Sequence, residues 1–328
     1  MNIHLGIDIG GTWLKYGAID TEGRILLSDR AATRGPEGEA GAVERIVDCA
    51  RRMVAWASEA EFTPVSVGIG SPGTVHAQTL LVQPPTPNLT VIIGVDLARL
   101  VREATGLPTA IDNDANCAAW GEYRYGAGRG IDNLICITVG SGIGSGFVVD
   151  GRIFSGPTGS GAELGHVTID WQGPPCACGN RGCLENYTSA NALLRRANDA
   201  ADRDRDSRLC ALRESSNGAL SIADLFRAAR EGDAVARAIL DQGADLLARG
   251  ILNAINLFDP EAVVIGGGVA DADTDGTWLA KVRDGIHRHA FSAEGKTLRV
   301  GKAAFGNDAG FIGAAALGAL AVNSESRC

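Results

Sequence analysis

Three cysteines and one histidine stand close together in the middle of the chain. Cys176, Cys178 and Cys183 fall within one short stretch, and His166 precedes them. Three thiolates and an imidazole form structural zinc sites of the Cys3His kind. Close cysteines also form disulfides, or pack as small apolar residues. Three thiols cannot all pair among themselves, however, and a Cys-x-Cys pair is awkward to bridge, so we expect zinc.

Two glutamates flank this ligand set in the sequence. Glu163 lies just before His166, and Glu185 lies just after Cys183. A metal that closes the loop 163–185 would also fix the directions of both carboxylates. The irregular segment is therefore a candidate polar wall of a binding site.

A glycine-rich turn near the start of the chain is a candidate phosphate site. Asp8 is followed by Gly10, Gly11 and Thr12, and Lys15 comes shortly after them. Successive N–H groups of such a turn can cradle a phosphate, and a carboxylate at a strand end can hold a hydrated Mg²⁺. Taken alone, two glycines between strands more often mark an ordinary hairpin turn.

The same design recurs in the second half of the chain. Thr138-Val139-Gly140-Ser141-Gly142-Ile143-Gly144 again joins two apolar strands through glycines and a hydroxyl. Two such turns that face each other across a cleft would clamp a polyphosphate. Gly266-Gly267-Gly268, after a buried strand, suits close approach to the sugar and base of a nucleotide. The pattern is neither the dinucleotide fingerprint nor a P-loop.

Asp112-Asn113-Asp114-Ala115-Asn116 is the candidate catalytic segment. It lies where an expected strand ends and an expected helix begins, and α/β proteins place ligand sites at such strand ends. Asp114 could accept the proton of a substrate hydroxyl while Asn113 orients that substrate. The alternative is an N-cap cluster, because Asn and Asp favour that position. These residues alone leave both interpretations open.

Apolar periodicity predicts an α/β order of elements. We expect strands over 3–9, 14–20, 24–31, 65–70 and 109–112, helices over 38–60 and 96–105, and a helix from about 113. The second half begins with strands over 133–139 and 143–149, continues with mainly helical residues 189–258 and a strand over 262–265, and ends with a helix over 308–320. Residues 200–218 are charged and are expected to form a helix end and a loop. Two similar α/β lobes around a cleft are therefore predicted.

Composition excludes several classes of protein. The 328 residues are 45% hydrophobic and 21% charged, as is usual for globular domains. The net charge of −9 argues against nucleic acid as the main partner, since phosphate binding needs clustered Lys and Arg. We find no signal peptide pattern and no apolar run long enough to cross a membrane. A cytoplasmic location, with free or metal-bound thiols, is expected.

Together these motifs resemble the ROK family (repressor, open reading frame, kinase). The resemblance covers nearly the whole chain. It rests on Asp8-x-Gly10-Gly11-Thr12-x-x-Lys15, Ser71-Pro72-Gly73, Pro87-Asn88-Leu89, Asn113-Asp114-Ala115-Asn116, Gly140-x-Gly142-x-Gly144, Glu163-x-Gly165-His166, the cysteine cluster with Glu185, and Gly266-Gly267-Gly268.

The resemblance implies a two-lobed actin-like ATPase (ribonuclease H-like) fold with a zinc-binding loop. It implies a small N-terminal α/β domain at residues 1–118, which the C-terminal helix at about 305–328 rejoins. Residues 119–304 would form the large α/β domain, with the zinc loop at 163–185. A homodimer or homotetramer is also implied.

The resemblance also implies roles for the residues of this chain that match the family's motifs. Asp114 is implied as the catalytic base. The implied hexose contacts are Gly73, Asn88, Asn113, Asp114, Glu163, His166 and Glu185. The implied ATP phosphate contacts are Gly10, Gly11, Thr12, Thr138 and Gly140, and we extend the site for ATP and Mg²⁺ to Asp8, Lys15, Ser141, Gly142, Gly267 and Gly268. The implied zinc ligands are His166, Cys176, Cys178 and Cys183.

The implied activity is ATP-dependent phosphorylation of the 6-hydroxyl of a hexose, with glucose the commonest substrate in the family. N-acetylmannosamine, N-acetylglucosamine, fructose and allose kinases share the motifs, and the sequence does not decide whether polyphosphate can replace ATP as the donor. The chain departs from the family's motif in one loop, because Thr90-Val91-Ile92-Ile93-Gly94 stands where the family often has Pro-Gly-Trp. In the family this loop lies near the sugar, so the departure bears on the choice of sugar.

Two other classes of function are less favoured. A sugar-sensing repressor carries an N-terminal helix-turn-helix, and the first expected strand, which begins at Ile3, leaves no room for one. A non-catalytic sugar binder would not need Asp114 and both phosphate turns.

Overall fold

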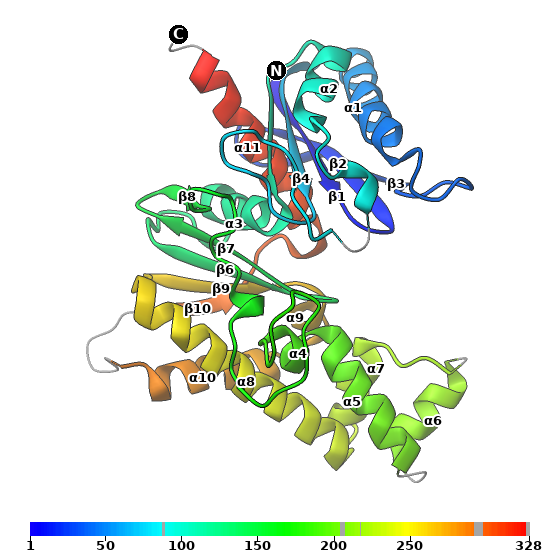
Figure 1. The fold of residues 1–328 in the computed structure, drawn as a ribbon, viewed down its shortest axis with the longest axis vertical. Helices are drawn as coiled ribbons and strands as arrows, with labels where there is room; N and C mark the ends of the chain where they lie inside the picture. Colours follow the sequence, from blue (N-terminus) through cyan, green and yellow to red (C-terminus); the bar gives the residue numbers. More distant parts are fainter. Residues whose placement is uncertain (87–88, 204–206, 217, 292–297, 326–328) are drawn as a thin grey trace. The chain divides into compact units, whose positions relative to one another are not determined.

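A computed structural model describes residues 1–86, 89–203, 207–216, 218–291 and 298–325 (Figure 1). The chain divides into two compact units. Unit 1 comprises residues 1–136, 146–162 and 303–328, and unit 2 comprises residues 137–145 and 163–302. The chain therefore crosses between the units several times.

The first sheet lies in unit 1 and has the strand order β3-β2-β1-β4-β5. Its strands are β1 (Asn2–Ile9), β2 (Trp13–Asp20), β3 (Ile25–Ala32), β4 (Thr63–Ser71) and β5 (Thr109–Asn113). β1, β2 and β3 are antiparallel neighbours, whereas β4 runs parallel to β1 and β5 parallel to β4. The parallel strands β1, β4 and β5 therefore end at the same edge of the sheet.

Helices cover both faces of this sheet (Figure 1). The apolar residues Ile3, Leu5 and Ile7 of β1 form one core with α1 (Ala42–Glu59) and α2 (Leu97–Thr105). On the other face, α11 (Ala309–Glu325) packs against β1 and β4, and α3 (Asp114–Tyr125) packs against α11. A Cβ atom at Gly6 or Gly68 would meet backbone oxygens of α11 at 2.0 and 1.6 Å. Glycine in the strands thus permits the close approach of this helix.

The second sheet has the order β10-β9-β6-β7-β8. Its strands are β6 (Leu134–Val139), β7 (Ile143–Val149), β8 (Arg152–Phe154), β9 (Ala262–Gly266) and β10 (Arg299–Lys302). With β6 in the place of β1, this order repeats that of the first sheet strand by strand. The expected repetition of one α/β design in the two halves is therefore confirmed at the level of the sheets.

The helices of unit 2 follow the candidate zinc loop in the sequence, and α9 packs against β9. They are α4 (Glu185–Thr188), α5 (Ala190–Arg203), α6 (Arg208–Ser215), α7 (Ile222–Arg230), α8 (Ala234–Phe258), α9 (Gly268–Ala272) and α10 (Thr277–His289). Single 3₁₀ turns occur at η1 (Thr90–Ile92), η2 (Leu164–His166) and η3 (Gly306–Asp308). The long α8 packs against α10 and α7.

Some expected elements differ from the structure. The helix expected over 38–60 begins only at Ala42, after a loop whose Gly35 and Gly38 pair with each other. Residues 200–218 were expected to form a helix end and a loop, which is wrong for 208–215. That stretch is the helix α6, capped by Ser207 and anchored by the buried Leu209. The strands β8 and β10 and the helix α10 were not expected.

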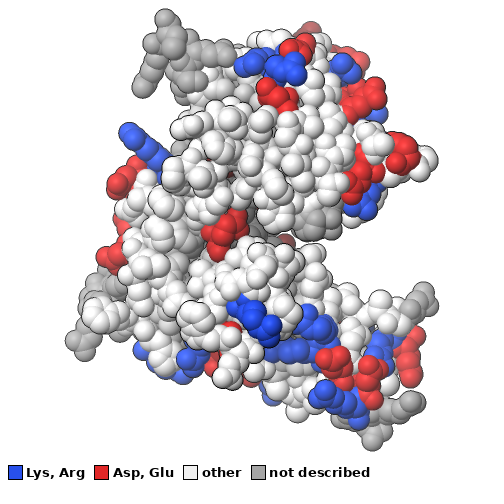
Figure 2. Space-filling view, viewed as in Figure 1, with Lys and Arg blue, Asp and Glu red and all other residues white. Residues whose placement is uncertain are grey.

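Charged residues of both signs lie on the face shown in Figure 2, and Lys and Arg side chains gather in its lower part. Among the described residues, we find no helix that is long and apolar enough to cross a membrane.

Candidate active site and metal centre

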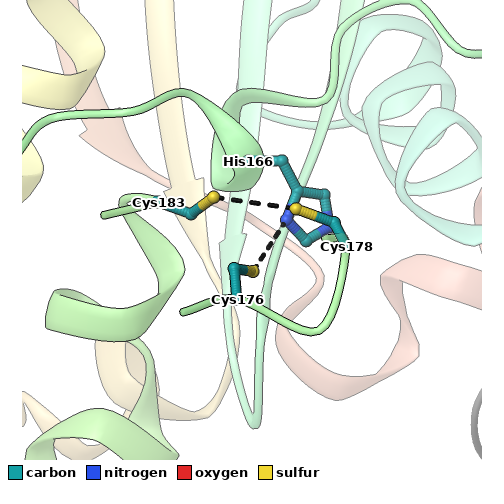
Figure 3. A group of neighbouring side chains, drawn as sticks. All are labelled: His166, Cys176, Cys178 and Cys183. Carbon is teal, nitrogen blue, oxygen red and sulfur yellow. Dashed lines mark hydrogen bonds between the residues drawn. The ribbon is translucent and has the colours of Figure 1, made fainter. Parts of the chain in front are cut away.

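The four candidate metal ligands converge in unit 2 (Figure 3). One ligand atom from each of His166, Cys176, Cys178 and Cys183 lies within 4.8 Å of all the others. Cys176 Sγ is 3.6 Å from His166 Nδ1, and Cys178 Sγ is 3.7 Å from Cys183 Sγ. A tetrahedral zinc ion places neighbouring sulfurs about 3.8 Å apart, and sulfur and nitrogen about 3.5 Å apart. The donor set and its dimensions therefore fit zinc, whereas a disulfide needs sulfurs about 2.05 Å apart.

Backbone pairing of the loop brings these ligands together. Thr168 pairs with Cys183, and Pro175 pairs with Arg181, so that the loop folds back on itself. The N–H of Cys176 donates to the carbonyl of Asn180 at 2.8 Å, which closes a tight turn around Cys178. His166 Nδ1 faces Cys176, so the Nε2 atom of the same ring is left for another partner.

Glu185 connects the metal loop to the second glycine turn. Its Oε2 accepts a hydrogen bond from the N–H of Ile143 at 2.8 Å. A Cβ atom at Gly142 would stand 2.4 Å from the same oxygen, so glycine makes room for the carboxylate. Glu185, which is expected to bind the sugar, and the turn at Gly142, which is expected to bind ATP, are therefore in direct contact.

Glu163 lies near the same carboxylate and near the candidate metal ligand His166. Burial raises the pKa of Glu163, the carboxylate of Glu185 raises this pKa further, and His166 opposes the rise. The next residue, Leu164, donates its N–H to Ser145 Oγ at 3.0 Å, which fixes η2 against β7. Glu163, His166 and Glu185 thus form one polar group within unit 2.

The third glycine segment lies against the second one. Gly267 has a φ of 89°, and a Cβ atom there would meet the backbone of Val139 at 2.6 Å. Gly140 accepts a hydrogen bond from the N–H of Ala190, at the start of α5, at 2.8 Å. A Cβ atom at Gly140 or Gly268 would meet nothing within 4 Å, so both backbones have open space beside them.

In unit 1, Asp114 is the first residue of α3, and Asn113 is its N-cap. Asn113 Oδ1 accepts from the N–H groups of Ala115 and Asn116 at 2.9 and 3.2 Å, and its Nδ2 donates to the carbonyl of Gly73 at 2.9 Å. The N-cap interpretation is therefore confirmed for Asn113. Asp114 is not the cap, although its Oδ1 accepts from Ala115 N–H at 2.8 Å.

Asp112 supports this turn and was given no role by the motif analysis. Its Oδ1 accepts from the N–H of Asn113 at 2.7 Å and from Nδ2 of Asn116 at 2.9 Å. Burial raises the pKa of Asp112, and these two hydrogen bonds oppose the rise. The spacing of Asp112 and Asn116, one helical turn apart, is the signal that would have found the pair.

The candidate phosphate turn near the start of the chain lies beside the same region of unit 1. Asp8 of β1, Gly70 of β4 and Asp112 of β5 stand in register across the sheet. Burial raises the pKa of Asp8 to about 6, and Lys15 opposes the rise. The negative charges of Asp8, Asp112 and Asp114 all raise the pKa of the buried Cys117 thiol, for which burial is the larger cause. The three carboxylates thus act on the same thiol of α3.

Thr33, which the sequence motifs did not indicate, fixes the turn at Gly10–Thr12 by hydrogen bonds. Thr33 Oγ1 donates to the carbonyl of Gly10 at 2.6 Å, and the N–H of Thr33 donates to the carbonyl of Thr12 at 3.0 Å. Lys15 Nζ donates to the carbonyl of Asn307 at 2.8 Å. No local motif marks Thr33, because its partners lie in the turn between β1 and β2, far from it in the sequence.

Of the expected sugar contacts, Asn88 lies outside the described residues. Gly73, Asn113 and Asp114 are grouped in unit 1, and Glu163, His166 and Glu185 are grouped in unit 2. The roles of both groups in binding remain predictions.

Two sheets of the same topology, each with a glycine turn after its first strand, define the class as the actin-like ATPase fold. The model of the ROK family matches residues 4–320. A glucokinase from Thermotoga maritima is 35% identical over 313 residues, which cover 95% of this chain and 96% of that protein.

A solved structure, that of a ROK family glucokinase from Streptomyces griseus in complex with glucose and AMPPNP, is 36% identical with a TM-score of 0.82. The match covers 97% of this chain and 99% of that one. A xylose repressor from Caldicellulosiruptor bescii is 30% identical over 90% of this chain and 73% of the repressor. The chain belongs to the ROK family, as its motifs indicated.

Proposed function

We propose that this chain is an ATP-dependent hexokinase that phosphorylates the 6-hydroxyl of glucose. The observation that carries the proposal is the arrangement at the start of α3, where Asp114 follows a capped, hydrogen-bonded turn beside a phosphate-type glycine turn. The similarity to glucokinases over nearly the full length of both chains supports glucose as the sugar.

In this mechanism Asp114 is the catalytic base. Its carboxylate accepts the proton of the sugar's 6-hydroxyl while that oxygen bonds to the γ-phosphorus of ATP, and ADP leaves. Such a base contributes about 10²- to 10⁴-fold to the rate. Asn113 and Gly73, which are hydrogen-bonded to each other, would bind the sugar beside Asp114, as would Asn88.

The polar group of unit 2 would bind the remaining sugar hydroxyls. Glu163 and Glu185 offer carboxylate acceptors, and His166 offers the Nε2 atom that does not face the sulfurs. Zinc held by His166 Nδ1, Cys176, Cys178 and Cys183 would fix the direction of the ring, as an outer hydrogen bond does in other metal sites. Zinc bound there would support the sugar pocket without taking part in phosphoryl transfer.

The glycine turns would bind ATP. Gly10, Gly11 and Thr12 present N–H groups and a hydroxyl to the phosphates, as do Thr138, Gly140, Ser141 and Gly142 in unit 2. Gly267 and Gly268 would lie against the nucleoside, and Lys15 and Asp8 complete the set. Asp8 would hold hydrated Mg²⁺, which supplies neutralisation of phosphate charge.

We further propose the domain division expected from the family. Residues 1–118 with about 305–328 would act as the small domain, and residues 119–304 as the large domain. Closure of these domains would exclude water and limit wasteful hydrolysis of ATP. The protein would work in the cytoplasm as a homodimer or homotetramer.

A coupled assay of ADP release over a panel of sugars tests the proposal. The panel contains glucose, fructose, mannose, allose, N-acetylmannosamine and N-acetylglucosamine, each with ATP or polyphosphate as donor. We expect glucose with ATP to give the highest kcat/KM. A clear preference for an acetylated sugar would replace the glucokinase assignment, and sugar binding without any ADP release would favour a non-catalytic sensor.

A further inference from the structure

Glu122 is a fully buried carboxylate that the proposed mechanism does not use. It lies on α3, two turns after Asp114, and its exposed fraction is 0%. Among the described residues, no Lys, Arg or His forms an ion pair with it. A buried, unpaired carboxylate is costly unless hydrogen bonds satisfy it. Its partners therefore explain why it is tolerated.

Those partners are three backbone N–H groups from two distant segments. Glu122 Oε2 accepts from Ala127 at 2.8 Å. Glu122 Oε1 accepts from Ala304 at 2.8 Å and from Phe305 at 3.1 Å. The first segment leaves α3 toward β6, and the second enters α11 from β10. One side chain thus joins parts of the chain that are 182 residues apart in sequence.

The packing around this carboxylate is tight. A Cβ atom at Gly126 would stand 2.2 Å from Glu122 Oε2 and 2.9 Å from the ring of Phe305. The backbone carbonyl of Glu122 also accepts from the N–H groups of Gly126 and Gly128, at 3.0 and 2.9 Å. Close by, a Cβ atom at Gly121 would meet the backbone of Gly313 at 3.0 Å, so α3 and α11 touch backbone to backbone.

These two segments are the routes by which α3 and α11 connect to the rest of the chain. Unit 1 extends from α3 as far as residue 136 and includes residues 146–162. The chain then enters unit 1 for the last time at Ala303, directly before the residues that Glu122 binds. We propose that Glu122 is a positioning residue for phosphoryl transfer, whose carboxylate makes the segments 126–128 and 303–305 move as one when the units reorient during turnover. The proposal rests on the proposed kinase function, because it assumes such a movement.

Glu122→Gln tests the role with the smallest change of shape. The amide keeps one oxygen acceptor, but its NH₂ group cannot accept a hydrogen bond. The variant therefore loses either the hydrogen bond from Ala127 or those from Ala304 and Phe305. We expect kcat for glucose phosphorylation to fall by about 10- to 100-fold, as for other small misplacements of reacting groups. The KM for glucose should stay within a factor of about three of the wild-type value, because no sugar contact changes. Glu103→Gln, which removes an exposed carboxylate on α2, is the matched control.

A folded Glu122→Gln protein with wild-type kcat would overturn the proposal, and so would a rise in the KM for glucose as large as the fall in kcat. If the variant does not fold, amide hydrogen exchange of the wild-type protein decides. The N–H groups of Ala127, Ala304 and Phe305 should stay equally protected with and without glucose and AMPPNP. Faster exchange on ligand binding would show that the clamp opens, which contradicts the proposal. A wild-type protein that does not phosphorylate glucose would instead refute the proposed function.

Discussion

At the scale of single residues, Asp114 is the position on which the proposed chemistry depends. Asp114→Asn removes the proton acceptor but keeps the shape of the side chain. We expect kcat to fall by about 10²- to 10⁴-fold, while the dissociation constant for glucose changes only modestly. Steady-state kinetics and calorimetric titration with glucose measure the two quantities. A variant that turns over at the wild-type rate would show that another group takes the proton.

Asp112 gives a second prediction at this scale. Its oxygen accepts hydrogen bonds from Asn113 and Asn116, and an asparagine oxygen can do the same. Asp112→Asn should therefore keep kcat near the wild-type value. Asp112→Leu leaves two donors without a partner, at a cost of about 1–3 kcal/mol each, and should lower both kcat and stability. Equal loss of kcat in the two variants would mean that the charge of Asp112 is needed.

At the scale of elements, the zinc loop is expected to serve the sugar pocket as well as stability. Cys178→Ser, or removal of zinc with a chelator, should release the metal and raise the KM for glucose or abolish activity. The physical reason is that His166, Glu163 and Glu185 lose their common support. Zinc content by mass spectrometry and glucose kinetics are measured on the same sample. Loss of zinc with unchanged KM would limit the loop to a structural role.

The pair of strands β1 and β4 carries a pH-dependent contact. His4 is buried, and its Nδ1 lies 2.8 Å from Ser66 Oγ. Burial lowers the pKa of His4, and Arg124 lowers it further. The unfolded chain therefore binds a proton more readily than the folded chain, so the free energy of unfolding should fall as the pH drops from about 7 to about 5.

Urea unfolding at several pH values measures this dependence. His4→Gln keeps a side-chain amide that can reach Ser66 but does not titrate, so its stability should change less over the same range. An identical pH slope in the two proteins would assign the effect to other groups.

At the scale of the whole molecule, ligand binding should stabilise the fold. A ligand that binds only the folded state adds about 2.7 kcal/mol at a free concentration 100 times its Kd. We expect glucose to raise the Tm in a thermal shift assay, and AMPPNP with Mg²⁺ to raise it further. Asp114→Asn should keep the glucose shift, because the base is not the main sugar contact. N-acetylglucosamine serves as the comparison sugar, and a larger shift with it than with glucose would contradict the proposed specificity.

The sequence by itself determined which side chains are candidate metal ligands, where most strands end, and the family. These features are local, because alternating apolar residues indicate a strand and residues such as Asn113 or Asp233 mark the start of a helix within a few positions. The helix α6 was missed because it is short and lies in a charged stretch. Burial of Leu209 and packing against α5 and α7 stabilise it.

Only the tertiary structure decided which distant residues meet. The register that aligns Asp8, Gly70 and Asp112, the contact of Glu185 with Ile143, and the clamp of Glu122 on Ala304 all depend on strand pairing and helix packing. The candidate zinc loop depends on both local sequence and tertiary packing. Its four ligands could be named from spacing, but its link to the glycine turn through Glu185 exists because β7 and η2 pack together, which no local pattern encodes.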